Sequence, residues 1–151
     1  MRFTTSRIAP SLADYLAPYF PDVQFLQDPE QQGLQTPCLF LQQRYSQMDK
    51  ETGGRYLRRL GLELTYLEDY HLTDLQQRYQ SAGEQLDLLM DFFPYREKGD
   101  GGETVWIRAH DRQWRIDLDA LHYQFELRER VFIPKDDVKM QNMREEVMAN
   151  E

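Results

Sequence analysis

Between residues 75 and 93, an apolar side chain recurs at every third or fourth position. The series is Leu75, Tyr79, Ala82, Leu86, Leu89 and Phe93. This spacing predicts one amphipathic helix that begins at a Thr73 cap and is stopped by Pro94. Each large apolar side chain contributes about 1.5–3 kcal/mol when buried, so the whole face is worth on the order of 10 kcal/mol before entropy costs. Such a helix needs a surface to cover, and we expect it to lie on a β-sheet.

Short apolar runs and alternating segments predict the strands of that sheet. They lie at residues 23–27, 37–41, 55–66, 104–109, 113–118 and 121–128. The segment 37–41 is apolar on both faces, which indicates a central strand, whereas 121–128 alternates and should have one wet face. We expect loops at 46–54 and 98–103 and a turn at His110-Asp111-Arg112.

An N-terminal helix is predicted to start at Pro10 and Ser11, with an earlier helical stretch through Ile8 left open, and to end at Pro18 and Pro21. Its apolar stripe consists of Leu12, Tyr15, Leu16 and Tyr19. The expected order of elements is therefore α-β-β-β-α-β-β-β. This order predicts an α+β fold, with an antiparallel or mixed β-sheet, the N-terminal helix and one long helix packed on it.

The chain should form one domain, at residues 1–134, followed by a tail at 135–151. The tail spaces four apolar side chains among charges: Val138, Met140, Met143 and Val147. We expect it to be either a weak amphipathic helix or a disordered arm that becomes ordered on a partner.

Composition excludes several classes of protein. The net charge is −8, which argues against stable nucleic-acid binding, because phosphates are bound by clustered Lys and Arg. Arg55, Arg58 and Arg59 alternate between the faces of a strand and form no single patch. The acidic balance would instead suit a surface past which DNA must slide. The absence of a long apolar run or signal-peptide core predicts no membrane segment and a location in the cytoplasm.

The candidate chemical groups do not converge. Cys38 is the only cysteine, lies in an apolar run and is predicted to be a buried, unreactive thiol. The three histidines lack the spacing of a helical metal pair. Asp117 and Asp119 share a strand face, but His122 falls on the opposite parity unless a bulge intervenes, and Asp is common beside turns. We therefore predict no catalytic residues, no metal site and no cofactor. The rich aromatic content, 13%, and the appended tail instead favour contacts with other proteins.

One segment carries a recognisable pattern. EQQGLQTPCLFLQ, residues 30–42, resembles the QGLxxPCxF signature of short prophage proteins classed as tail-terminator-like. The matching residues are Gln32, Gly33, Leu34, Pro37, Cys38 and Phe40. More loosely, the N-terminal helix, the strand at 62–67, the long helix, the final strand and the charged tail follow the family layout. Gly33 and Pro37 also fit a plain junction between a loop and a central strand.

The resemblance implies a non-enzymatic phage tail protein. Members of this family form hexameric rings, or stay monomeric until they meet the tube; they cap the tail tube, end its polymerisation and join the tail to head-neck proteins. The implied partners are further copies of the chain, the tail tube protein and sheath or neck proteins. The implied locations are the host cytoplasm during assembly and the virion tail. Candidate interface residues are Met48, Asp49 and Lys50, with Val138, Met140, Met143 and Val147 in the tail.

Two alternatives stay open at this point. The chain could serve another assembly role, as a tail completion protein or a chaperone. It could also be a small ligand-binding domain or an enzyme that uses Asp117, Asp119 and His122. A concave pocket holding those three side chains together would favour the second alternative.

Overall fold

The computed structural model describes residues 4–27, 35–97, 103–117 and 119–132. Within these ranges the elements are α1 (Ile8–Leu16), β1 (Gln24–Leu26), β2 (Cys38–Lys50), β3 (Arg55–Leu67), α2 (Leu75–Leu89), β4 (Phe92–Arg96), β5 (Thr104–Asp117) and β6 (Ala120–Phe132). Short 3-10 turns lie at Thr5–Arg7, Ala17–Tyr19 and Thr52–Gly54. The fold is α+β, as the sequence predicts. The order of elements agrees only by coincidence, because β4 was not predicted and the predicted strands at 104–109 and 113–118 form the single strand β5.

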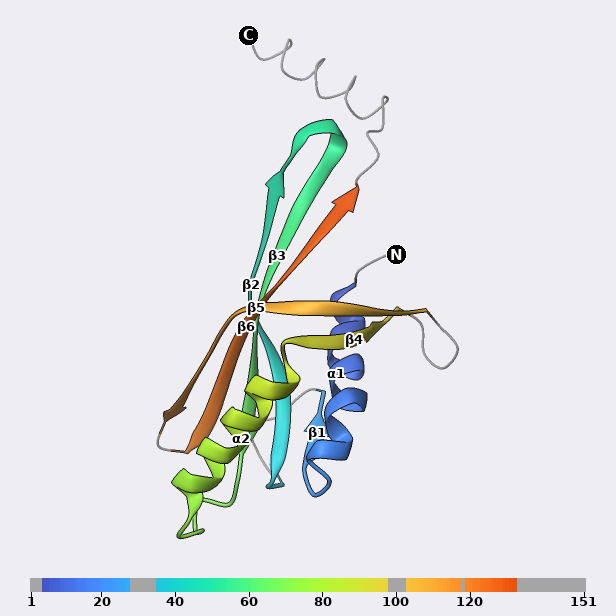
Figure 1. The fold of residues 1–151 in the computed structure, drawn as a ribbon. Helices are drawn as coiled ribbons and strands as arrows, with labels where there is room; N and C mark the ends of the chain where they lie inside the picture. The colour runs from blue at the N-terminus through green and yellow to red at the C-terminus, as the bar shows by residue number, and fades with distance from the viewer. Residues whose placement is uncertain (1–3, 28–34, 98–102, 118, 133–151) are drawn as a thin grey trace, which may run out of the picture.

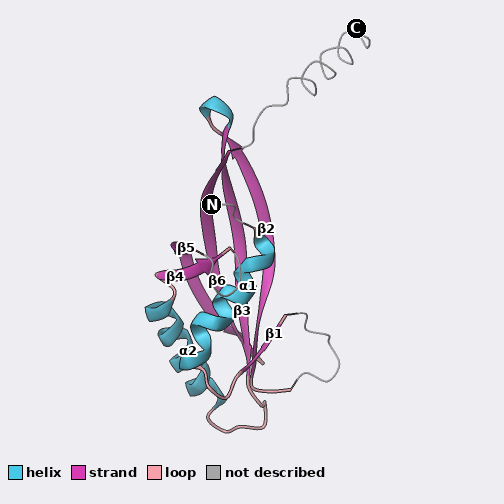
Figure 2. Cartoon of the chain, turned by 90° about the vertical axis from the view of Figure 1, so that its right-hand side faces the viewer, coloured by secondary structure: helices cyan, strands magenta, loops and turns pink. Residues whose placement is uncertain are grey.

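All the strands join one curled sheet in the order β1-β2-β3-β6-β5-β4 (Figure 1). β1 is parallel to β2, and the other neighbours are antiparallel. At one edge of the sheet, α1 packs along β4: the backbone N–H of Arg96 donates to the Ser11 hydroxyl at 3.1 Å, and Arg7 Nε donates to the Arg96 carbonyl. α2 packs on β5 and β6. The two helices thus cover different parts of the curled sheet (Figure 2).

The register between β3 and β6 forms the core. Leu60 pairs with Leu127, and Leu62 pairs with Phe125. All four side chains are at most 3% exposed and lie in one apolar cluster with residues of both helices. Because side chains alternate across a strand, the residues between them point to the opposite face of the sheet, which neither helix covers.

Asp87 fixes α2 to the sheet. Its carboxylate accepts hydrogen bonds from Tyr123 Oη at 2.8 Å and Trp114 Nε1 at 2.9 Å. Gly83, one turn earlier, leaves room for the Trp114 ring, since a Cβ there would come within 2.7 Å of it. Arg112 also donates to the Asp87 carbonyl. One acidic side chain thus joins the helix to both β5 and β6.

The long helix is shorter than predicted. It ends at Leu89, and its N-cap is Asp74 rather than Thr73, with no side-chain capping bond. Phe93 is fully buried, as its place in the stripe requires, but it lies in β4. Pro94 lies inside β4, which tolerates it because β4 is an edge strand and needs no N–H there.

The N-terminal helix has the earlier of the two starts left open by the sequence, and its end was predicted wrongly. The helix begins at Ile8, and Pro10 is tolerated in its first turn, where backbone N–H groups have no partner within the helix. Ser11 does not cap it, because its hydroxyl donates to the Arg7 carbonyl at 2.7 Å. Pro18 lies within the following 3-10 turn rather than ending the helical segment.

Two predicted breaks in the strands are absent. Residues 46–50 belong to β2 instead of a loop, so that only 51–54 connect β2 with β3. The predicted turn at residues 110–112 is a bulge within the continuous strand β5, where the register shifts between His110 and Gln113. Asp111 adopts a positive φ of 51° and pairs with Arg128 at 2.8 Å, so the polar residues that suggested a turn serve the bulge.

We predict that Leu86→Ala lowers the free energy of unfolding by about 2–5 kcal/mol, because it opens a cavity in the core. Leu88→Ala is the matched control, since Leu88 lies on the same helix and is 84% exposed, whereas Leu86 is 1% exposed. The control should change stability by less than about 0.5 kcal/mol. Urea unfolding of both variants checks this, and equal losses would contradict the packing of α2.

Candidate functional site

Three strands project beyond both helices (Figure 1). β1 pairs only with Cys38–Phe40, and β5 pairs with β6 no further than Leu127 before its other half joins β4. What remains is a sheet of β2, β3 and β6. We call it the extension, residues 42–59 and 126–132, and include Glu126 and Leu127 as its base, where β6 still pairs with β5. None of residues 42–50, 55–59 and 128–132 is buried. The extension thus presents a large surface outside the core.

The predicted interface residues Met48, Asp49 and Lys50 lie in the extension. Met48 is 42% exposed, although strand β2 rather than a loop presents it. Asp49 lies 3.9 Å from Arg59 on the neighbouring strand. The other four predicted interface residues, Val138, Met140, Met143 and Val147, lie outside the described residues.

The extension differs in charge from the rest of the protein. It contains seven arginines and lysines against four acidic residues, a net charge of +3, whereas the whole chain carries −8. The other described residues have six basic against fourteen acidic side chains, a net −8. The overall acidity therefore conceals a basic end.

Glu126 organises the charges at the base of the extension. It is only 3% exposed, and its carboxylate accepts hydrogen bonds from Tyr45 Oη at 2.5 Å, Arg59 Nε at 3.0 Å and Arg128 Nε at 2.6 Å. Burial alone would raise the pKa of Glu126, but these three hydrogen bonds outweigh it and hold the pKa at about 2. The prediction of a wet face on β6 is therefore wrong at this position.

Gly61 makes this arrangement possible. It pairs with Tyr45 on one side and with Glu126 on the other. A Cβ at residue 61 would come within 2.2 Å of the Tyr45 ring, so only glycine lets the phenol lie flat across β3 and reach the carboxylate.

A second polar cluster lies further along the same face. His122 Nδ1 is 3.2 Å from Glu63 Oε2, and His122 Nε2 is 3.4 Å from Asp117 Oδ2. Burial favours a higher pKa for Glu63, but hydrogen bonds from Gln124, His122 and Thr65 lower it overall. The expectation that Asp117 and His122 lie on opposite faces was wrong: they lie on paired strands, β5 and β6, and not on one continuous strand.

Asp119 does not join this cluster through its side chain. Its carbonyl accepts the Tyr79 hydroxyl at 2.8 Å, which ties the turn before β6 to α2. Glu63 and His122 are themselves held by strand neighbours, and the adjoining hollow is small, about 150 Å³. The cluster has the composition of a polar sheet face, and we assign it no reaction.

The QGLxxPCxF signature is described only in part, since Gln32, Gly33 and Leu34 lie outside the described residues. The Pro37 carbonyl accepts a hydrogen bond from the Gln24 N–H at 3.0 Å, which joins β1 to β2. Cys38 is fully buried, and burial raises the pKa of its thiol, as expected of an unreactive cysteine. Phe40 is 9% exposed and pairs with Leu26.

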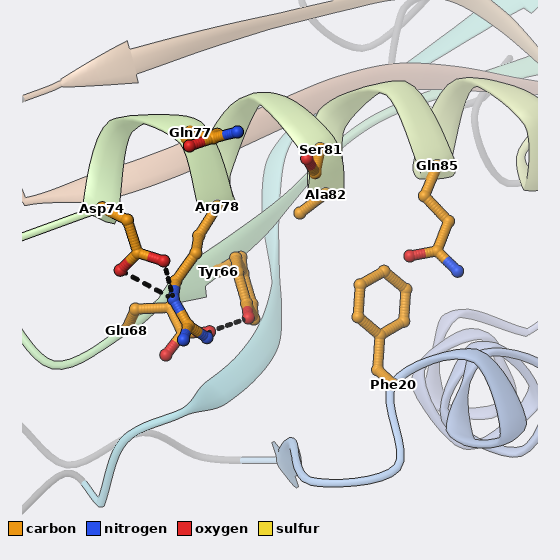
Figure 3. Close-up of a pocket in the computed structure, with 9 residues that line it drawn as sticks. All are labelled: Phe20, Tyr66, Glu68, Asp74, Gln77, Arg78, Ser81, Ala82 and Gln85. Carbon is orange, nitrogen blue, oxygen red and sulfur yellow. Dashed lines mark hydrogen bonds and ion pairs between the residues drawn. The ribbon is translucent and has the colours of Figure 1, made fainter. Parts of the chain in front are cut away.

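An open groove of about 390 Å³ lies between α2 and the end of β3 (Figure 3). Arg78 crosses it, donating to Asp74 at 3.0 Å and lying 3.8 Å from Glu68, which also accepts the Tyr66 hydroxyl. Phe20 closes one side, with its ring centroid 6.0 Å from that of Tyr66. These polar groups satisfy one another, so the groove has the character of a surface hollow.

No group of three or more His, Cys, Asp or Glu side chains in the described part of the chain could hold a metal ion. The described helices also include none with the length and apolar character to cross a membrane.

The fold and surface thus define a small α+β protein whose most prominent feature is an exposed, charged sheet extension. A family model with the description "Phage tail terminator protein" matches residues 7–139. The chain belongs to this phage tail terminator family, a family of structural phage tail proteins. A comparison with curated proteins found no match.

Sequence reasoning missed the extension and the role of Glu126. The available signal was strand length: a segment as long as 55–66, following a tight turn, requires an antiparallel partner of equal length. That argument would have extended β2 through residue 50.

We predict that ionised Glu126 stabilises the fold above pH 4.5, its ordinary pKa, and that this contribution is lost as the pH falls toward 2. Its size is on the order of 1–2 kcal/mol, because the partner arginines are about a third exposed and screened. Glu126→Gln should lower stability at pH 7 and flatten the stability curve between these pH values.

The measurement is urea unfolding from pH 2 to 7. The matched control is Glu84→Gln on the exposed face of α2, which should keep the pH dependence of the unchanged protein. A Glu126→Gln variant with an unaltered curve would show that Glu126 is not the group responsible.

Proposed function

We propose that this protein caps the phage tail tube, ends its polymerisation and joins the tail to the head-neck proteins. The family match over residues 7–139 carries the proposal. The structure supports it through a core that occupies one face of the sheet and an extension left free for contacts. Virion assembly then takes place in the host, and the protein remains in the tail.

A cap on a tube with several equivalent subunits requires several copies of the chain, and we propose a hexameric ring, either formed in advance or assembled on the tube end. A closed ring uses heterologous contacts, in which one surface of a subunit meets a different surface of its neighbour. Each contact of standard size buries about 800 Å² per partner. The tube protein, and the sheath or neck proteins, would occupy the two faces of the ring.

Deleting the gene from an inducible prophage tests this proposal. We expect tails of uncontrolled length that do not join heads, because nothing stops addition of tube subunits. Electron microscopy of the induced particles measures tail length and joining. The intact gene supplied in trans is the control and should restore tails of uniform length.

Normal, joined tails in the deletion would contradict the proposal. Mass spectrometry of purified particles separates the alternatives: a terminator stays in the particle, whereas a chaperone is released. Absence of the protein from intact particles would favour the chaperone.

We further predict that removing residues 135–151 impairs capping without unfolding the domain. The reason is the spacing of Val138, Met140, Met143 and Val147, which suits an arm that becomes ordered when it binds a neighbouring subunit. Oligomer mass and tail length should both change. The control is a full-length chain in which charged residues of 135–151 are changed to Ser while Val138, Met140, Met143 and Val147 are kept. This control should retain capping. If the truncated chain behaves as the intact one in both assays, the arm has no such role.

A further inference from the structure

We propose that the basic extension of one subunit docks on the acidic outer face of α2 in a second copy of this chain. The proposal rests on the proposed function, because it names the two surfaces that join neighbouring subunits of the cap. The partner follows from the charges and from the positions of the two surfaces.

The extension offers a basic surface with apolar side chains among the charges. Arg44, Lys50 and Arg55 are exposed, and Met48 and Phe132 are 42% and 68% exposed. The register puts Met48 and Lys50 on one face of the extension and Arg55 and Phe132 on the other, so each face carries a cation and an apolar side chain. A net basic element with exposed apolar side chains fits a partner that supplies an apolar contact and the opposite charge.

The outer face of α2 supplies both. Leu88 is 84% exposed, the most exposed of the large apolar side chains described. Glu84 lies four residues before it in α2, and Asp91 follows it in the bend after the helix, where its carboxylate lies 3.8 Å from Arg112 Nη2. An exposed leucine beside acidic groups offers an apolar contact together with the charge opposite to that of the extension.

The two surfaces lie apart along the length of the molecule, so one subunit cannot bring its own two surfaces together. Both views place the β2–β3 turn at one end and α2 toward the other (Figures 1 and 2). A contact between the two ends therefore joins different copies and is heterologous, which is the type that closes into a ring. Pairing of two extensions is disfavoured instead, since each carries +3.

The test uses the full chain with charges exchanged between the two surfaces. The extension variant carries Arg44→Glu, Lys50→Glu and Arg55→Glu, and the α2 variant carries Glu84→Lys and Asp91→Lys. Each alone should weaken self-association by roughly tenfold or more, because like charges then meet. Sedimentation velocity over a concentration series measures association, and urea unfolding confirms that each variant is folded.

Mixing the two variants in equal amounts should restore association, because a negative extension then meets a positive helix, and the reverse. One chain with all five substitutions should also self-associate. Asp14→Lys, which reverses an exposed charge on α1, is the matched control and should leave association unchanged.

An intact protein that stays monomeric at every concentration overturns the inference. The inference is also overturned if the variants associate like the intact protein or if mixing them does not restore association. A third contrary result is an extension variant that loses binding to a short DNA duplex but associates normally. In these cases the proposed function is still supported if the intact gene, supplied in trans to the deletion, restores tails of uniform length. If mixing restores association but the gene deletion gives normal tails, the contact between copies is supported and the proposed function is contradicted.

Discussion

The pairing of β3 with β6 is the constraint on which the rest of the structure depends. Its register places Leu60, Leu62 and Leu64 on one face with Phe125 and Leu127, and both helices pack into the same cluster. A shift by one residue would turn every one of these side chains to the other face. The same alternation puts Glu126 and its arginine partners on the uncovered face, so one register determines both the core and the polar surface.

The helices cover only part of the long strands, and this gives the protein its surface for contacts. Where α1 and α2 end, β2, β3 and β6 continue as a sheet without a core. Such a sheet exposes backbone edges, and charged side chains protect them from unspecific pairing. The ion pairs and hydrogen bonds around Glu126 hold the base of the extension together and substitute for hydrophobic packing there. A structural phage protein thus gains a projecting, charged element on a stable domain.

Much of the fold could be predicted from local patterns, but not its boundaries. The apolar stripe of α2 was right from Leu75 to Leu89, since both of these residues pack against the core. Phe93 was rightly predicted to be buried but lies in a strand, because periodicity says nothing of where a helix gives way to an edge strand. The turn expected at Asp111 became a bulge, since Arg128 on the next strand pairs with that carboxylate. Of the candidate surface, only Met48, Asp49 and Lys50 were foreseen, and they were assigned to a loop.

By itself the sequence determined the α+β class, the presence of the two helices, the buried Cys38 and the resemblance to tail terminators, because these depend on spacing and on short motifs. Tertiary structure alone decided that Tyr45, Arg59 and Arg128 converge on Glu126, and that a basic extension projects from an acidic body. Those features depend on contacts between residues up to 81 positions apart, as between Tyr45 and Glu126, and on strand register. Local patterns do not contain this information, since it arises only when the strands pair.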